Sequence, residues 1–437
     1  MQLIDHIQSL DFSAQLPTTL LKVNQQFDAP QVEDVALATR QAWLDNGILQ
    51  RIAPGDTVAI GVGSRGITNL ALIVKETVAQ LREMGAEPFI VPAMGSHAGA
   101  TAEGQRDMII QLGVSPEVVG AEIRATMEVV QIGQVEDGGP PLYQDVISAE
   151  ADHVLLINRI KPHTSFRSSI ESGLAKMAVI GLGKQHGAAT MHSQGVQALK
   201  QFIGPAARVY ESQTNLIGGL ALLENAYHQT AEIVALTAAE IGAEPETALL
   251  EKAKALIAGL PFEEIDVLVV RQLGKNVSGT GMDTNVIGRL KIPREPENFG
   301  GPDIAVIAVL DLTEKTHGNS NGIGLANVTT ARVAEKIDWK AMYTNAISAG
   351  ILGMWRAHLP VTMADDRRAV QVAVRGCGQS QEAVRMVFIE DTMNLNTLWV
   401  SPNLREVVEA HPRLTILEEI PLQFGETGKL CSPWALP

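Results

Sequence analysis

The sequence predicts an α/β protein of two domains, and three observations support this. Short runs of β-branched residues alternate with longer segments of helical apolar period, which is typical of βαβ units and a parallel sheet. The chain has 437 residues, more than one ordinary hydrophobic core accommodates. A helical segment ends near residue 260, where the βα pattern begins again. We therefore predict a parallel-sheet N-terminal domain over residues 1–260, a smaller α/β domain over residues 261–437, and a cleft between them.

In the N-terminal domain, the first predicted strand is "TVAIGV", and a helix from about Asn69 to Met84 follows it. The strand "PFIVPA", a helix from about Glu103 to Leu112 and the strand "HVLLINRI" come next. "NLIGGLALLENAYHQTAEIVAL" predicts a strand, a loop and either another strand or a short helix. "TALLEKAKALIAGLPF" predicts a helix whose last turn lies near residues 259–261.

The C-terminal domain begins with the apolar run "IDVLVVRQL". "DIAVIAVLDL" and "AVQVAVR" are two further predicted strands, with helices between them. This shorter alternation predicts the smaller α/β domain.

Composition and charge limit the classes of function. The formal net charge of −15 argues against binding to nucleic acid or to an anionic membrane. Cys377 and Cys431 are the only cysteines, which excludes a disulfide framework or a thiolate zinc cluster and fits a reducing compartment. The sequence shows no export signal and no apolar run of about 18 residues. We therefore expect a cytoplasmic protein whose partners are small molecules or other protein chains.

The stretch "GVGSRG", which begins at Gly61, satisfies the dinucleotide-binding pattern G-x-G-x-x-G between a predicted strand and a predicted helix. The next strand, however, carries Glu87 at its start and no carboxylate at its end, where a ribose would lie. Arg65 also stands where backbone amides would have to approach a pyrophosphate closely. A tight turn would explain Gly61 and Gly66 but not Arg65. The stretch alone leaves open whether it binds a dinucleotide or serves another purpose.

Histidines follow two of the predicted strands. His97 lies in "MGSHAGAT" directly after "PFIVPA", and His163 lies in "NRIKPHTSF" after "HVLLI". Each alone has an ordinary explanation as a solvated or capping side chain. Ligands bind at the carboxyl ends of strands in open α/β sheets, however, and Arg65 follows a third strand. The joint placement favours a shared functional site.

Lys176 lies in the middle of "GLAKMAVIGLG", an otherwise apolar run. A buried, unpaired ammonium is costly or has a lowered pKa, which is how nucleophilic lysines arise. A lysine that reaches solvent from a half-buried helix is the alternative. Lys184, His186 and His192 follow in one polar stretch, where a neutral imidazole could bind zinc, nickel or copper. No His-x-x-x-His or carboxylate cluster supports a metal site made by protein ligands alone.

Taken together, these residues resemble the lactate racemase family, whose members use a nickel-pincer nucleotide cofactor. The family pattern has an arginine after the first strand, a histidine in a turn after the second, and a Pro-His pair after a later strand. A cofactor lysine and a metal-binding histidine complete it. The corresponding series here is Arg65, His97, His163, Lys176 and His192.

This chain departs from the family pattern in two places. "GVGSRG" replaces the usual Asp-His-Thr-Arg-Pro around the arginine, which leaves the substrate open. "NRIKPHTSFRSSIESGLAK" differs from the family's glycine-rich version of that loop, and the step from His163 to Lys176 is longer. This second difference leaves open whether the cofactor is covalently attached, and whether through Lys176 or Lys184.

The resemblance implies an isomerase that racemises or epimerises a 2-hydroxy acid by reversible hydride transfer. Arg65 would hold the substrate carboxylate, and His97 and His163 would act as general bases on opposite faces. The cofactor, a pyridinium thioamide/thiocarboxylate mononucleotide carrying nickel, would be supplied by maturation proteins. Lys176 or Lys184 would bind the cofactor, and His192 would bind its metal.

The C-terminal domain contributes polar loops, "GKNVSGTGMDTN" and "DLTEKTHGNSNGIGLAN", after two apolar strands. The first ends in a segment that resembles the family's Asp-x-Asn. Side chains of these loops are expected to bind the substrate by closing over it, although solvated loops without a ligand are the alternative. The candidates are Lys275, Asp283, Asn285, Glu314, Lys315 and His317.

Two other functions remain as alternatives. The first is a nicotinamide-dependent oxidoreductase that uses Gly61, Gly63 and Gly66. The second is a nickel-nucleotide or small-anion binding protein that keeps Lys176 and His192 but has lost catalysis.

Overall fold

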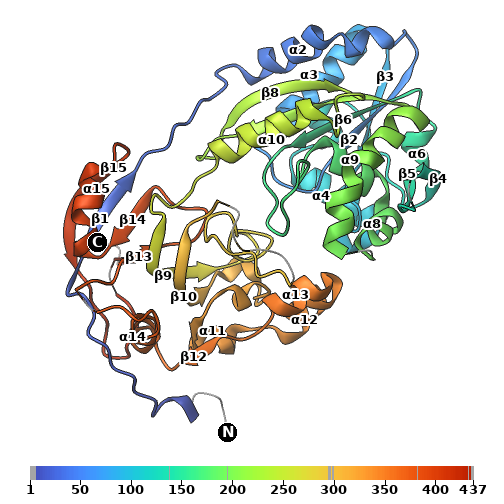
Figure 1. The fold of residues 1–437 in the computed structure, drawn as a ribbon. Coiled ribbons are helices and arrows are strands. Elements are labelled where there is room, and N and C mark those ends of the chain that lie inside the picture. Colours follow the sequence, from blue (N-terminus) through green and yellow to red (C-terminus); the bar gives the residue numbers. More distant parts are fainter. Residues whose placement is uncertain are drawn as a thin grey trace. The chain divides into compact units, whose positions relative to one another are not determined.

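The computed structural model describes residues 6–136, 138–193, 195–293, 297, 300–380, 382–431, 433 and 434. The chain divides into two compact units (Figure 1). The middle unit is Asp28–Ile257, and the terminal unit combines Met1–Phe27 with Ala258–Pro437. Both units consist of a sheet with helices, so the predicted α/β class is confirmed.

The division differs from the predicted one at the N-terminus. Residues up to Phe27 belong to the terminal unit and not to the predicted domain of residues 1–260. The reason is β1 (Thr19–Gln25), which pairs antiparallel with both β14 (Thr397–Val400) and β15 (Leu414–Pro421). These partners lie almost 400 residues away in the chain, at a separation that local sequence patterns do not report.

The middle unit is built on a five-stranded sheet in the order β3-β2-β6-β7-β8. The first four strands are parallel, and β8 pairs antiparallel with β7. The bounds are β2 Thr57–Val62, β3 Glu87–Pro92, β6 His153–Arg159, β7 Leu216–Glu224 and β8 Thr230–Thr237. All the strands predicted in this domain are present, and the segment left open between strand and helix is the strand β8.

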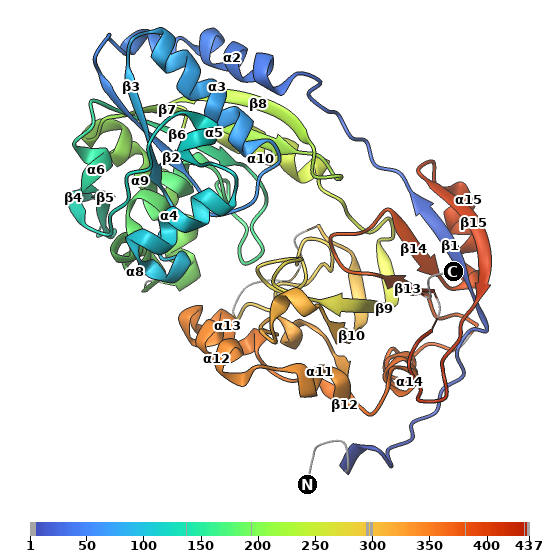
Figure 2. The same ribbon diagram turned by 180° about the vertical axis from the view of Figure 1, so that it is seen from behind.

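Helices cover both faces of this sheet. Figures 1 and 2 show α9 and α10 on one side and α2 and α3 on the other. Each face has its own apolar core, formed by alternate side chains of the same strands: Ala59 of β2 belongs to one core and Ile60 to the other. The helices are α2 Val35–Asn46, α3 Leu70–Glu83, α4 Ala102–Gln111, α5 Pro116–Val119, α6 Val146–Ala149, α7 Leu174–Lys176, α8 Lys184–Ser193, α9 Gly195–Gln213 and α10 Glu244–Leu256. A π-helix, Met177–Leu182, lies between α7 and α8, and a hairpin of β4 (Val129–Gln134) and β5 (Pro141–Asp145) packs beside them.

The predicted helices of this unit are confirmed, with small shifts at their ends. Asn69 and Met84, the expected ends of α3, are its capping residues. Thr101 caps α4 by accepting a hydrogen bond from the Gly104 amide. The last predicted helix ends earlier than expected, because Ile257 is already extended.

The terminal unit has an eight-stranded mixed sheet in the order β12-β11-β10-β9-β13-β14-β1-β15. The five strands from β12 to β13 run parallel, and β14, β1 and β15 pair antiparallel. The remaining strands are β9 Glu264–Leu273, β10 Asp303–Leu312, β11 Val328–Thr330, β12 Val361–Met363 and β13 Met386–Ile389. The helices are α11 Ala331–Lys336, α12 Trp339–Ser348, α13 Gly350–Arg356, α14 Asp366–Gly376 and α15 Arg405–Ala410.

One predicted strand of this unit is wrong. "AVQVAVR" lies in the helix α14, where Ala369, Val370, Ala373 and Val374 are buried. This spacing forms one helical face, and the alternation of valine with other residues was misread as a strand period. The side chain of Asp365 caps the helix by accepting from the Arg368 amide at 2.9 Å.

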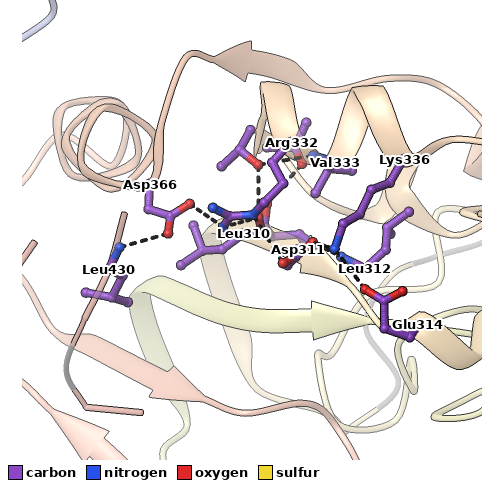
Figure 3. A network of polar contacts seen from close by, with 12 residues as sticks. Leu310, Asp311, Leu312, Glu314, Arg332, Val333, Lys336, Asp366 and Leu430 are labelled. Atoms are coloured by element: carbon purple, nitrogen blue, oxygen red, sulfur yellow. Dashed lines mark hydrogen bonds and ion pairs between the residues drawn. The ribbon is translucent and has the colours of Figure 1, made fainter. Parts of the chain in front are cut away.

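A network of ion pairs joins β10, α11 and α14 (Figure 3). Arg332 pairs with Asp311 at 3.1 Å and with Asp366 at 2.6 Å, and Lys336 pairs with Asp311 at 2.8 Å. Asp366 also accepts a hydrogen bond from the Leu430 amide at 2.9 Å. The network thereby ties the segment that follows β15 to the helices of the sheet. Over the part of the chain that the structure describes, no helix is both long and apolar enough to span a membrane.

Candidate functional site

Three loops of the middle unit carry the predicted site residues of the first half of the chain. Arg65 follows β2, His97 follows β3 and His163 follows β6. These strands are neighbours in the order β3-β2-β6 and run parallel, with Val62 of β2 opposite both Pro92 and Ile157. Their carboxyl ends therefore meet at one edge of the sheet, where open α/β sheets bind ligands.

His97 joins two of these loops. Its Nδ1 lies 2.5 Å from the Oγ of Ser64, the residue before Arg65. The pKa of His97 is lowered from its ordinary 6.5 to about 4, first by burial and then by the charges of Arg65, Lys176 and His192. The residue as a whole is nevertheless exposed to solvent. His97 is therefore a neutral imidazole at neutral pH that a ligand from solvent can reach, and the predicted residues around it are close enough to act on it.

Lys176 ends α7, where the chain enters the π-helix Met177–Leu182. Its pKa is lowered from 10.5 to about 8, first by burial and then by Arg65, while Glu171 opposes the shift. The amine lies 5.6 Å from the ring centroid of Phe166, which a cation favours. A single π-helical turn inside a helix frequently marks a functional site. Lys176 thus combines a part-buried amine with an appreciable neutral fraction.

His192, near the end of α8, is the fourth member of this group. Its pKa is lowered, first by burial and then by Lys176. The residue as a whole is exposed to solvent, as His97 is. Arg65, His97, Lys176 and His192 therefore act on one another electrostatically, and we call these four residues the basic cluster.

His163 lies next to this cluster through Phe166, whose ring centroid is 4.4 Å from that of His163. The backbone amide of His163 donates to the buried carboxylate of Glu171 at 2.7 Å. The Nδ1 of its ring accepts from the Ser165 amide at 3.0 Å. In this arrangement a neutral His163 carries its proton on Nε2.

Glu171 organises the loop that carries His163. Besides the His163 amide it accepts from Ser168 N at 3.3 Å, and it pairs with Lys254 of α10 at 3.2 Å. Its side chain is fully buried. Glu171 thus holds the backbone of the loop that carries His163 in place.

Lys184, the rival to Lys176, has a different environment. Its side chain is completely buried, and its amine donates to the carbonyl of Pro92 and, at 3.3 Å, to Oε1 of Gln105. Burial lowers its pKa to about 8, and Asp145 opposes this shift. The amine is hydrogen-bonded to residues at the end of β3 and in α4, so the structure does not bring Lys184 into the basic cluster.

Arg65 has no hydrogen bond or ion pair to any of the described residues, and part of the residue is in contact with solvent. Its pKa is lowered, first by burial and then by a second guanidinium, that of Arg159. Arg65 can therefore accept an anionic ligand without giving up a protein partner. Sequence reasoning missed Arg159, whose only signal was its place at the end of the strand "HVLLINR".

The glycines of "GVGSRG" do not have the geometry of a dinucleotide loop. Gly61 lies inside β2, where a Cβ would come within 2.7 Å of the Leu156 side chain of β6, so glycine serves strand packing there. Nothing lies within 4 Å of a Cβ added to Gly66, although the third glycine of the fingerprint allows close helix–strand packing. The following helix begins only at Leu70.

The predicted residues of the terminal unit lie in loops after two neighbouring parallel strands, β9 and β10. The amine of Lys275 donates to the carbonyls of Gly279 and Asn321 at 2.8 Å, and the Lys275 amide donates to Thr316 Oγ1 at 3.0 Å. Asp283 Oδ1 accepts from the Asn285 side chain at 2.7 Å. Glu314, Lys315 and His317 follow β10 and are exposed. Glu314 also forms an ion pair with Lys336. Closure of these loops over a substrate stays a prediction.

No metal site made by protein ligands alone is found among the described residues, since no three His, Cys, Asp or Glu side chains come together suitably for a metal ion.

Comparison with known proteins gives likenesses of structure alone. No family model and no curated protein sequence matches the chain. The lactate racemase apoprotein from Thermoanaerobacterium thermosaccharolyticum is similar in structure, with 11% identity, a TM-score of 0.45, and coverage of 86% of this chain and 89% of that chain. A Thermotoga maritima protein is similar with 13% identity, a TM-score of 0.43, and coverage of 64% and 72%. Both likenesses are distant.

Proposed function

We propose that this protein is an isomerase that racemises or epimerises a 2-hydroxy acid with a nickel-pincer nucleotide cofactor. The observation that carries the proposal is the basic cluster, in which Arg65, His97, Lys176 and His192 interact at the carboxyl end of the middle sheet. These are the residues on which the resemblance to the lactate racemase family rests. These residues are spread over more than a hundred positions of the sequence, and the charge interactions among them support a shared site.

Arg65 would bind the substrate carboxylate. A guanidinium presents parallel N–H donors that match a carboxylate in two-point geometry. Arg65 is surrounded by positive charge from Arg159 and Lys176, so an anion there relieves repulsion as well as forming hydrogen bonds.

His97 would accept the hydroxyl proton through Nε2, because its Nδ1 is occupied by Ser64. Two of the charges that lower the pKa of His97 belong to Arg65 and Lys176. A carboxylate bound at Arg65 would offset one of them and make His97 a stronger base when substrate is present.

His163 would serve the opposite face. A neutral His163 carries a proton on Nε2, so it can donate to the substrate oxygen. To act as a base, it must expose a bare Nε2, which requires the proton on Nδ1 and opening of the contact with Ser165 N. The two histidines therefore begin the reaction in different states.

The chain's residues fit the cofactor that the resemblance implies. The part-buried amine of Lys176, with a pKa of about 8, has the neutral fraction that covalent attachment needs. His192 would supply one ligand to a metal whose other ligands come from the nucleotide. When bound, the cofactor would supply reversible hydride acceptance for inversion at the α-carbon.

Metal analysis and intact mass of protein made together with the cofactor-maturation proteins test this function. We expect bound nickel and a mass increment on Lys176, and both Lys176→Ala and His192→Ala should reduce nickel. An increment on Lys184 would overturn the assignment to Lys176. Stoichiometric zinc without an adduct would overturn the cofactor proposal.

Isotope labelling tests the hydride route. A 2-hydroxy acid deuterated at the α-carbon should keep its label in the inverted product, and unlabelled substrate in heavy water should gain none. Chiral chromatography with mass spectrometry measures both. Wash-out of the label would indicate proton transfer with solvent in place of hydride transfer.

The two alternative functions predict other results. A nicotinamide-dependent oxidoreductase should bind NAD or NADP in a titration, which the geometry of Gly61 and Gly66 does not favour. A degenerate binding protein should retain nickel on Lys176 and His192 and yet show no inversion of any 2-hydroxy acid.

A further inference from the structure

We propose that Arg159 forms a second anion-binding subsite beside Arg65, so that the substrate is a 2-hydroxy acid with a second carboxylate. This inference rests on the proposed function, whose substrate class it narrows. It is carried by the placement of Arg159 and by the donors of its guanidinium.

The subsite is built at the ends of three adjacent strands. Arg65 follows β2, Arg159 ends β6 and Glu224 ends β7, and these strands run parallel in that order. Within β6 and β7, Arg159 lies opposite Leu222, two residues before Glu224. All three side chains are thus at the edge of the sheet that carries the basic cluster.

The guanidinium of Arg159 is only partly used by the protein. Its Nη1 donates to Oε2 of Glu224, and no other hydrogen bond or ion pair of Arg159 is found among the described residues. The Arg159 side chain is 19% exposed, and none of its unused N–H donors is among the buried polar atoms without a partner, so a ligand from solvent can reach them. Unused, reachable donors of a guanidinium that is held in place favour an acceptor from a ligand.

Glu224 positions this guanidinium through the ion pair. Its second oxygen, Oε1, accepts from the Thr68 amide at 2.9 Å, three residues after Arg65. Glu224 thereby links Arg159 to the loop that carries Arg65. The ring of His228 responds to Glu224 and also to two cations, Arg159 and Lys161. Two cations and one carboxylate therefore act on the ring of His228.

Burial lowers the pKa of Arg65, and the positive charge of Arg159 lowers it further. The guanidiniums of Arg65 and Arg159 therefore repel each other. One carboxylate on Arg65 leaves the donors of Arg159 unused. A second carboxylate on the same molecule would accept hydrogen bonds from them. Arg65 would then hold the carboxylate next to the hydroxyl-bearing carbon, and Arg159 would hold the distal one.

The phosphate of the nucleotide cofactor could also bind to Arg159. The experiment must therefore distinguish a substrate carboxylate from the cofactor's phosphate. Isothermal titration calorimetry on the full-length chain, purified without cofactor, measures binding of both enantiomers of malate, both enantiomers of lactate, and inorganic phosphate. We expect malate to bind at least about 10-fold more tightly than lactate, the scale of one charge-assisted two-point contact.

Arg159→Gln should abolish this preference, because malate affinity should fall by a larger factor than lactate affinity. Arg40→Gln is the matched control, because it removes one arginine from a salt bridge of the same unit, between α2 and α3. Arg159→Lys keeps the charge without the planar fork and should retain only part of the preference. Thermal unfolding of each variant verifies the fold, and Arg159→Lys carries the test if Arg159→Gln does not fold.

Equal binding of malate and lactate by the unaltered protein would overturn the inference. So would a loss on Arg159→Gln that affects both acids equally. If Arg159→Gln weakens phosphate binding and cofactor-derived nickel retention but leaves the malate preference intact, the anion is the cofactor's phosphate and the dicarboxylate substrate is refuted.

Failure of the inference is distinguishable from failure of the proposed function. The loaded enzyme inverting lactate but not malate, with label retention, would leave the isomerase proposal standing and overturn this one. Selective malate binding that depends on Arg159, without nickel or inversion, would support the subsite and overturn the isomerase.

Discussion

Lys176 and Lys184 both have a pKa lowered to about 8 by burial, but Lys176 is half-buried and Lys184 is completely buried. The amine of Lys184 is enclosed and donates to Pro92 and Gln105. A limiting amount of an amine-selective acylating reagent at pH 8 should therefore modify Lys176 ahead of other lysines and leave Lys184 unmodified. Peptide mass mapping measures this, and modification of Lys184 at the same rate would contradict the assignment.

Removal of each lysine should have opposite effects on stability. Lys184→Met leaves the Pro92 carbonyl without its donor and should cost about 1–3 kcal/mol in the free energy of unfolding. Lys176→Met removes an ammonium that burial disfavours and should be neutral or stabilising. Because the folded pKa of Lys176 lies below 10.5, the unfolded chain binds more protons between pH 8 and 10.5, so its contribution to stability rises with pH there. Denaturant unfolding at pH 7 and pH 10 measures both effects, and Lys176→Met should flatten that rise.

The planar guanidinium of Arg65 is proposed to contact the substrate carboxylate at two points. Arg65→Lys keeps the charge but loses the two-point contact, so substrate affinity should fall about 10- to 100-fold. Nickel content should not change, because this proposal assigns Arg65 to the substrate. Loss of cofactor from the Arg65→Lys variant would instead assign the loop to the cofactor.

His97 should titrate below its ordinary pKa of 6.5 in the cofactor-free protein, since burial and three neighbouring basic groups disfavour its charged form. Lys176→Met removes one of these charges and should raise the pKa of His97. Nuclear magnetic resonance titration of the His97 ring measures the change, with Lys252→Met, a surface lysine paired with Glu232, as the control. Equal pKa values in both variants would show that Lys176 does not act on His97.

At the scale of elements, α7 depends on α10 for its first hydrogen bonds. The carboxylate of Glu246 accepts from Ala175 N at 3.2 Å and from Gly242 N at 2.7 Å, and it is buried. It fills the place of a helix cap that Gly173, which has no side chain, does not supply. The backbone that carries Lys176 is therefore held by a carboxylate about 70 residues away in the chain.

Glu246→Ala should destabilise the protein by about 1–3 kcal/mol, because it leaves buried backbone amides without an acceptor. Glu244→Ala, at an exposed position in the first turn of the same helix, is the control and should cost less than about 0.5 kcal/mol. Urea unfolding compares the two. If both variants lose the same stability, Glu246 acts through its helix alone and not through α7.

At the scale of the whole molecule, the chain enters and leaves the middle unit once each, at Phe27/Asp28 and at Ile257/Ala258. The fragment of residues 28–257 contains its entire sheet and both cores, so it should fold when expressed alone. A fragment of residues 258–437 lacks β1, the strand between β14 and β15, and should aggregate or remain unfolded. Circular dichroism and size-exclusion chromatography measure these outcomes, and joining residues 6–27 to the second fragment through a flexible linker should restore folding.

The sequence by itself determined the α/β class, most of the strands and helices, and the candidate residues of the middle unit. Apolar periodicity records which face of an element is buried, so β2, α3 and β6 could be predicted from their own residues. The placement of Arg65, His97 and His163 at one end of the sheet could also be predicted, because each follows a predicted parallel strand directly. The period was misread only at α14, where a short run fits both helix and strand.

Tertiary structure alone decided which residues share a neighbourhood. β1 reaches its partners across almost the whole chain, and Glu224, Thr68 and Arg159 meet from three separate strands or loops. Lys176 and Lys184 stand in similar apolar and glycine-rich sequence, yet Lys176 is half-buried and the amine of Lys184 is enclosed by β3 and α4. Burial and charge depend on atoms brought together by packing, and a local pattern in sequence does not specify those atoms.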